Sequence, residues 1–234
     1  EKIREMATGD YKRIPICKEL YADSYTPVEM MRILQKASHH CYLLESLASS
    51  DSWGRYTFLG YEPGLEITCV DGRVRITDNG QVTQQNTQHP GEILRRIVAE
   101  HKSPKIEGFP TFTGGLVGYF SYDFIKYAEP NLKLDAEDQE HFNDFDLMLF
   151  DKVICFDNLK QKIILIANAS TDDLDSSYPA AVRALDEMAQ LIRTGTPAPD
   201  QPLKLRSEFR HLFDKEQYCS MVERARKYIY EGDI

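Results

Sequence analysis

The sequence predicts an α+β fold, with antiparallel β-sheets and helices packed against them. Two β-prone runs lie between residues 41 and 59, and residues 65–85 alternate apolar and polar side chains. Segments with helical apolar spacing separate the strands. They do not follow the regular strand-helix alternation of a parallel doubly wound sheet, so hairpins are expected instead of parallel crossovers.

Three segments of the first 195 residues have the apolar spacing of helices. Residues 27–38 follow Thr26, a hydroxyl cap, with Pro27 at the first helical position and Glu29 three residues after the cap. Residues 90–101 carry an apolar stripe. Residues 178–193 are the third, and Gly195 is expected to end that helix in a left-handed conformation.

Turn residues set the expected strand boundaries. Asp71-Gly72 and Asn79-Gly80 supply the positive φ that tight hairpin turns need, so residues 65–85 are predicted to form a meander. Residues 147–156 are predicted to form one long strand. It pairs with residues 162–167 across a turn at residues 157–160.

A change in composition after residue 195 predicts a boundary. Residues 197–202 contain three prolines, which is typical of a linker. A new helix follows, with Asp214 and Gln217 as a capping pair, an apolar stripe, and Gly232 as its stop. An amphipathic helix needs a surface to pack on, so the sequence is expected to be the front part of a longer protein.

Composition excludes several classes of function. The formal net charge of −9 repels nucleic-acid phosphates and anionic lipids, and no basic cluster offsets it. The apolar runs are far shorter than the roughly 18 residues that cross a bilayer. The five cysteines are widely spaced and include no C-x-x-C pair, so neither a disulfide framework nor a zinc site is indicated. A cytoplasmic protein without nucleic-acid or membrane partners is expected.

Several motifs that could carry chemistry favour structural roles. The glycines of residues 113–118 lack the spacing of a dinucleotide loop and the Lys-Ser/Thr of a Walker loop, which favours close approach of a neighbour to a strand. His39, His40 and Cys41 are adjacent, but successive strand residues point to opposite faces, so no metal site is expected. The acidic residues 135–140 lack the pattern of a calcium loop.

The pattern within residues 43–63 favours a small-molecule site. Glu45 and Ser46 end one apolar strand, and Arg55 begins the next. If the strands pair, these three side chains come together. The Glu45 carboxylate can bind an ammonium group, the planar Arg55 guanidinium can bind a carboxylate, and Ser46 adds a hydroxyl, which suits a zwitterion. A cross-strand salt bridge between Glu45 and Arg55 is the structural alternative.

Three motifs resemble one family when they are taken together. They are Leu43-Leu44-Glu45-Ser46, then residues 54–60 (GRYTFLG), then residues 114–123 (GGLVGYFSYD). In order and spacing they resemble the amino-terminal region of anthranilate synthase component I, one of the chorismate-utilising synthases. The later strand at residues 150–157 agrees, and residues 218–234 resemble the first helix of the chorismate-binding domain. The resemblance covers nearly the whole chain.

The resemblance implies an activity for the complete protein. It would convert chorismate and ammonia into anthranilate and pyruvate in tryptophan biosynthesis, as a lyase, with a glutamine amidotransferase subunit supplying the ammonia. In this family magnesium and the catalytic residues belong to the carboxy-terminal domain. No catalytic residue, metal or cofactor is therefore expected in these residues, and the fragment is expected to be inactive alone.

The resemblance also implies a regulatory role for residues 1–195. In the family the Leu-Leu-Glu-Ser strand forms part of the pocket where tryptophan binds as feedback inhibitor, which points to Glu45 and Ser46, and to Arg55 because some relatives have a basic residue near that place. The rest of that pocket comes from the carboxy-terminal domain. Residues 196–213 are then the linker, and residues 214–234 begin the chorismate-binding catalytic domain.

Two alternatives stay open at this point. Aminodeoxychorismate synthase component I, a relative that makes a folate precursor, shares these motifs. A stand-alone module that binds an amino acid, without a catalytic half, is the alternative from a different class.

Overall fold

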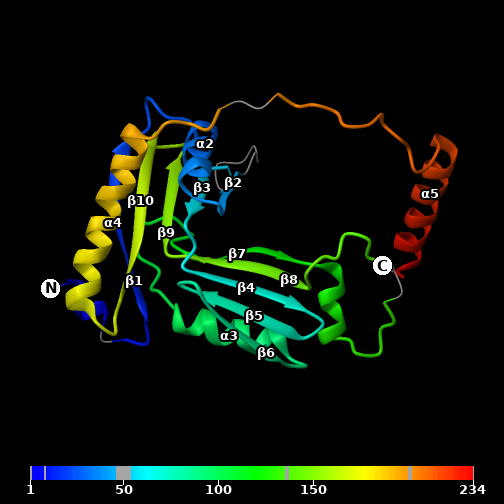
Figure 1. Cartoon of the computed structure of the whole chain (residues 1–234), viewed down its shortest axis with the longest axis horizontal. Helices are drawn as coiled ribbons and strands as arrows, with labels where there is room; N and C mark the ends of the chain where they lie inside the picture. Colours follow the sequence, from blue (N-terminus) through cyan, green and yellow to red (C-terminus); the bar gives the residue numbers. More distant parts are fainter. Residues whose placement is uncertain (1, 8, 46–53, 135–136, 200–201, 234) are drawn as a thin grey trace. The chain divides into compact units, whose positions relative to one another are not determined.

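A computed structural model describes residues 2–7, 9–45, 54–134, 137–199 and 202–233 (Figure 1). The chain divides into two compact units, residues 1–198 and residues 199–234. The first unit contains two antiparallel five-stranded sheets with helices, which confirms the predicted α+β fold. The finer division into a linker at residues 196–213 and a catalytic-domain helix at residues 214–234 stays a prediction.

Sheet A has the strand order β1-β10-β9-β3-β2, and all its strands are antiparallel (Figure 1). Their bounds are β1 (Arg13–Tyr21), β10 (Lys162–Ser170), β9 (Lys152–Asp157), β3 (Tyr56–Tyr61) and β2 (Cys41–Leu44). Helices α2 (Pro27–Ala37) and α4 (Leu174–Thr194) pack on one face. Their buried side chains, such as Leu34 and Met188, meet Leu59 and Leu165 of the sheet in the larger hydrophobic core.

Sheet B has the order β6-β5-β4-β8-β7. Its strands are β6 (Gln81–Asn86), β5 (Arg73–Asp78), β4 (Leu65–Val70), β8 (Phe145–Phe150) and β7 (Gly115–Phe120). Helix α3 (Pro90–Glu100) and the 3-10 helix η1 (Tyr122–Tyr127) contribute to the core on one face, where Ile93 packs with Ile67 and Phe145. A short helix, α1 (Lys2–Met6), precedes both sheets.

Local signals specify the start of α2 and the two hairpin turns as predicted, whereas α4 begins at Leu174, before the predicted start at residue 178. The Thr26 side chain accepts a hydrogen bond from the main-chain N–H of Glu29 at the start of α2. The residues of both predicted turns, Asp71-Gly72 and Asn79-Gly80, have positive φ, and each pair joins two neighbouring strands of the meander. These elements follow from a few adjacent residues, which is why the sequence predicts them.

The prediction of one long strand at residues 147–156 is wrong. The segment forms β8 in sheet B and β9 in sheet A, with Asp151 between them. Asn168 braces this crossing, because its Nδ2 donates to the main-chain oxygens of Asp151 (3.0 Å) and Thr113 (2.7 Å). The apolar run continues through the crossing, so hydrophobicity alone does not show that the chain changes sheets.

Two glycine predictions have different outcomes. Gly195 follows α4 but is extended, with φ −63° and ψ 142°, so the expected left-handed cap is wrong. A Cβ atom there would lie 2.4 Å from Ile33 Cγ2, and close packing explains the glycine. The prediction of close approach at residues 113–118 is confirmed. A Cβ on Gly118 would lie 2.0 Å from the main-chain oxygen of Asp146 in the neighbouring strand.

The second unit consists of an extended segment and helix α5 (Lys215–Glu231). Asp214 and Gln217 form the predicted capping box, and Gly232 has the left-handed φ of 81° that ends the helix. Within this unit the apolar side chains of the helix, including Tyr218 and Ile229, are exposed. Among all helices of the described residues, none combines the length and the apolar character that a membrane span needs.

Candidate functional site

The predicted site lies at the β2 edge of sheet A. Strand β2 is outermost and pairs with β3, with Cys41 opposite Tyr61 and Leu44 opposite Phe58. Glu45 directly follows β2 and is exposed. Ser46 lies outside the described residues, and so does most of the segment that connects the two strands. The expected pairing of the two strands is confirmed, and it brings Glu45 and Arg55 to the same end of the hairpin, where the connecting segment joins β2 to β3.

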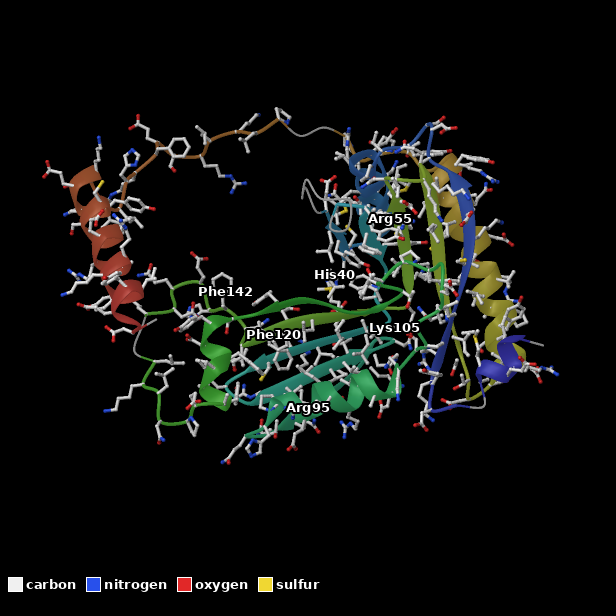
Figure 2. All side chains as sticks on the ribbon, turned by 180° about the vertical axis from the view of Figure 1, so that it is seen from behind. His40, Arg55, Arg95, Lys105, Phe120 and Phe142 are labelled. Atoms are coloured by element: carbon white, nitrogen blue, oxygen red, sulfur yellow. The ribbon has the colours of Figure 1, made fainter. Side chains whose placement is uncertain are left out.

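Arg55 immediately precedes β3 and forms a bidentate ion pair with Asp157, the last residue of β9 (Figure 2 labels Arg55). The Nη2–Oδ2 distance is 2.7 Å and the Nε–Oδ1 distance is 3.1 Å. The Asp157 side chain is only 1% exposed, whereas that of Arg55 is 28% exposed. The strand register brings the two side chains together, because Tyr56, the residue after Arg55, lies opposite Asp157.

The carboxylate of Asp157 also organises the β9–β10 turn. Oδ1 accepts from the main-chain N–H groups of Leu159 and Lys160. Burial alone would raise the pKa of Asp157, but the hydrogen bonds from Arg55 and these N–H groups outweigh burial and hold the pKa below its usual value. The same ion pair raises the pKa of Arg55. Arg55 is therefore a charged group held in a fixed orientation.

The structural alternative, a cross-strand salt bridge between Glu45 and Arg55, differs from the ion pair that the structure shows. Among the described residues, Arg55 pairs with Asp157 rather than with Glu45. Sequence reasoning missed Asp157, whose only signal is its place at the end of a β-prone run. Two guanidinium nitrogens are engaged, and for Nη1 no partner is found within the described part of the chain. Arg55 thus keeps a donor for a ligand carboxylate.

Aromatic side chains lie beside Arg55 on the face of sheet A that α2 and α4 do not cover. Its guanidinium carbon lies 4.7 Å from the ring centre of Tyr56. Phe58 packs against Tyr56 at 5.9 Å and against Phe112 at 5.7 Å between ring centres. Leu44, on the adjacent edge strand, is 49% exposed. This apolar surface next to a cation suits an aromatic or aliphatic group attached to a carboxylate.

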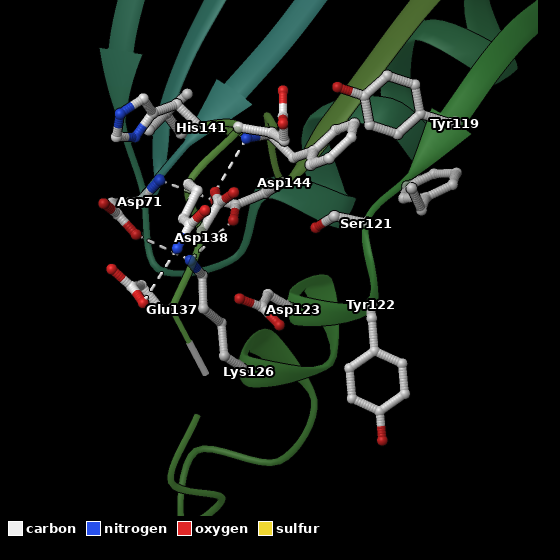
Figure 3. A pocket seen from close by; sticks show the side chains of 15 residues that line it. Asp71, Tyr119, Ser121, Tyr122, Asp123, Lys126, Glu137, Asp138, His141 and Asp144 are labelled. Atoms are coloured by element: carbon white, nitrogen blue, oxygen red, sulfur yellow. Dashed lines mark hydrogen bonds and ion pairs between the residues drawn. The ribbon is translucent and has the colours of Figure 1, made fainter. Parts of the chain in front are cut away.

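A cavity of about 880 Å³ lies away from this edge, at the end of sheet B next to η1 (Figure 3). A hydrogen-bonded network borders it. The Asp144 carboxylate accepts from Tyr127 Oη at 2.6 Å and pairs with Lys126 Nζ at 2.7 Å. Tyr127 Oη in turn accepts from the main-chain N–H of Gly72. The network fixes η1 to the β4–β5 turn, and hydrogen bonds to Asp144 and Asp71 raise the pKa of Lys126 although burial opposes this.

The chemistry of this cavity does not suit an anionic substrate. Its lining carboxylates outnumber its single lysine; they belong to Asp71, Asp123, Glu137, Asp138, Glu140 and Asp144. A dicarboxylate such as chorismate would be repelled by them. Within the described ranges, no three His, Cys, Asp or Glu side chains are grouped so that they could hold a metal ion. His40, one of the residues considered for a metal, instead contacts Glu66, with 2.8 Å between Nδ1 and Oε1.

Comparison with known proteins places the chain in a known class of enzymes. Its residues 39–234 match the model of the chorismate binding enzyme family, and the chain belongs to that family. Among the curated relatives that it matches along its whole length are proteins named anthranilate synthase component 1. It is 34% identical to the one from Acinetobacter calcoaceticus and 31% identical to the one from Acetivibrio thermocellus.

A solved structure agrees with these relatives. The crystal structure of anthranilate synthase component I from Streptococcus pneumoniae TIGR4 superposes with a TM-score of 0.54 and 27% identity, over 92% of this chain. It is matched over 46% of its own length. The chain likewise spans about half of the curated relatives, 47% and 48% of the two named above. The resemblance found in the sequence is thereby confirmed at the level of family and fold.

Proposed function

We propose that this chain is the amino-terminal half of an anthranilate synthase component I. The complete protein would convert chorismate and ammonia into anthranilate and pyruvate, the committed step towards tryptophan. The observation that carries this proposal is that the whole of this chain matches about half the length of relatives that bear that name. The acid-lined cavity at sheet B is unsuited to chorismate, so we assign the chemistry to the carboxy-terminal half.

The role of this half would be regulatory, with tryptophan as the ligand. A zwitterionic amino acid needs an acceptor for its ammonium group, a donor for its carboxylate and an apolar surface for its side chain. Glu45 would accept from the ammonium, Arg55 would donate to the carboxylate through Nη1, and Ser46 would add a hydroxyl. Leu44, exposed on the neighbouring strand, offers apolar surface for the indole ring. Because Asp157 holds Arg55, the donor is fixed before the ligand arrives.

Inhibition would follow from a shift between two domain arrangements. Tryptophan bridging this edge and the carboxy-terminal half would favour an arrangement that binds chorismate poorly. Linkage then requires chorismate to weaken tryptophan binding by the same factor. We further propose a glutamine amidotransferase subunit as the source of ammonia and magnesium as a cofactor of the carboxy-terminal half. The unpaired cysteines of the chain suit a reducing cytoplasm.

Product identification in the complete protein tests the assignment. The full-length enzyme is incubated with chorismate, ammonium and magnesium, and the aromatic product is identified by chromatography and mass. Anthranilate with pyruvate is the expected result. Aminodeoxychorismate would assign the protein to the folate branch, and no product from a protein that still binds tryptophan would indicate a binding module.

A further inference from the structure

Strand β6 is an open sheet edge without the protection that edge strands usually carry. It is the outermost strand of sheet B, and all six of its residues, Gln81–Asn86, are exposed. From Gln81 to Gln88 the sequence QVTQQNTQ contains no charged residue and no proline. Natural proteins protect edges with charges, prolines, bulges or very short strands, because free main-chain groups pair with other strands.

The other edges of the two sheets differ from β6 in this respect. Strand β1 contains Pro15 and the charged pair Lys18-Glu19, and β2 is only four residues long. Strand β7 has glycines with φ of 143° at Gly115 and 156° at Gly118, which depart from regular strand geometry. Only β6 among the edge strands described combines regular geometry, six residues and an uncharged sequence.

Hairpin geometry shows which main-chain groups of β6 are free. Asn79-Gly80 is a two-residue turn, so Asp78 and Gln81 form a hydrogen-bonded pair and such pairs alternate along the ladder. The main-chain N–H of Thr87 donates to the main-chain oxygen of Gly72 at 2.9 Å, which agrees with hydrogen-bonded pairs at the odd-numbered residues of this strand. The main-chain groups of the even-numbered residues, Val82, Gln84 and Asn86, therefore point away from β5.

We propose that β6 is a self-association surface, where two copies of the protein join antiparallel through this strand. With Gln84 opposite Gln84 on a two-fold axis, Val82 of each copy faces Asn86 of the other, and all outward main-chain groups find partners. The second copy is the fitting occupant, because an antiparallel two-fold pairing satisfies the same row of groups on both sides. Glutamine amides then lie opposite each other, and no like charges are opposed.

Electrostatics do not oppose this join. The nearest charges on the neighbouring strand are Arg73 and Arg75, and Arg75 lies opposite Gln84. In the joined sheet the Arg75 residues of the two copies are separated by three strand spacings, about 14 Å. That distance exceeds the Debye length of about 8 Å at physiological ionic strength. A six-residue strand buries little surface, so the association is weak and depends on protein concentration.

Sedimentation velocity of the full-length protein tests the proposal, with concentrations from about 1 to 200 µM around the micromolar range typical of small interfaces. The weight-average sedimentation coefficient is expected to rise with concentration. Gln84→Pro removes an outward N–H that the β5 ladder does not use, and it is expected to weaken association roughly tenfold or more. Gln84→Thr keeps the N–H and is the matched control, expected to associate like the wild type.

Two further measurements keep the test decisive. Circular dichroism and the Tm establish that Gln84→Pro is folded; if it is not, Val82→Lys, which adds a charge at the edge, takes its place. Gln84→Cys is expected to form an intermolecular disulfide on oxidation. The two controls, Asn79→Cys in the turn and the parent protein, are expected to form none. Three outcomes would each overturn the proposal: a wild type that stays monomeric, association unchanged in the folded edge variant, or amides of Val82, Gln84 and Asn86 whose protection from exchange does not depend on protein concentration.

Discussion

Arg55 and Asp157 are 102 residues apart and form a two-point ion pair that ties the start of β3 to the end of β9. The carboxylate is buried, and the guanidinium is at the surface beside the proposed inhibitor site. The pair thus links the stability of sheet A to the orientation of a residue assigned to ligand binding.

Asp157→Ala is expected to destabilise the protein by about 1–3 kcal/mol, because it removes the partner of Arg55 and of two turn N–H groups. Asp186→Ala is the matched control. Its ion pair with Lys18 is exposed, and such pairs contribute about 0–1 kcal/mol. Urea unfolding gives both free energies. Equal losses in the two variants would contradict the structural role of Asp157.

The depressed pKa of Asp157 predicts a dependence on pH. A carboxyl group with a lowered folded-state pKa contributes stability above its unfolded value, about 3.9, and that stability is lost as pH falls through the lower folded value. The wild type is therefore expected to lose more stability than Asp157→Asn between about pH 5 and pH 2. Urea midpoints measured across this range check the difference, and parallel curves would refute it.

Tyr127→Phe is expected to cost about 1–3 kcal/mol of unfolding free energy, because the main-chain N–H of Gly72 loses its acceptor and Asp144 loses a donor. Tyr122→Phe is the control. Tyr122 is 81% exposed, and a surface change of this kind stays within about 0.5 kcal/mol. If the two variants unfold at the same urea concentration, the network does not stabilise η1 as described.

Gly118→Ala is expected to destabilise sheet B by about 1–3 kcal/mol, because the added methyl group meets the oxygen of Asp146. Gly91→Ala provides a control of opposite sign. Gly91 lies in α3 with nothing near its Cβ position, and alanine is favoured in helices by about 0.5–1 kcal/mol. Thermal unfolding of both variants should show opposite shifts in Tm. A shift of the same sign in both would contradict the close approach of β7 and β8.

Features that depend on adjacent residues could be predicted from the sequence. Thr26 caps α2 through a residue three positions away, and Asn79-Gly80 requires only its own backbone geometry. The glycine pattern around Gly118 correctly predicted close approach, but the neighbouring oxygen belongs to Asp146, on another strand. The cap and turn signals are local because the groups that interact are close along the chain, whereas the partner of Gly118 is not.

Features that depend on distant pairing could not be predicted. Asp157 meets Arg55 only because β3 pairs with β9, and no residue near Arg55 specifies that partner. The change of sheet at Asp151 is hidden in a continuous apolar run, since both strands are buried there. At Gly195 the sequence suggested a left-handed φ as the reason for the glycine. In the structure the reason is close packing, because Ile33 leaves no room for a side chain at this position. Sheet topology decides these features.

Tryptophan inhibition of the full-length enzyme tests the central claim most directly. Anthranilate formation is measured against tryptophan concentration for the wild type, for Ser46→Phe and for the exposed surface control Asn131→Phe. Ser46→Phe is expected to need at least about tenfold more tryptophan for half inhibition, the loss of roughly 1.4 kcal/mol of binding, with turnover preserved. Inhibition unchanged in Ser46→Phe, at the level of Asn131→Phe, would contradict the assignment of this edge of sheet A to the inhibitor.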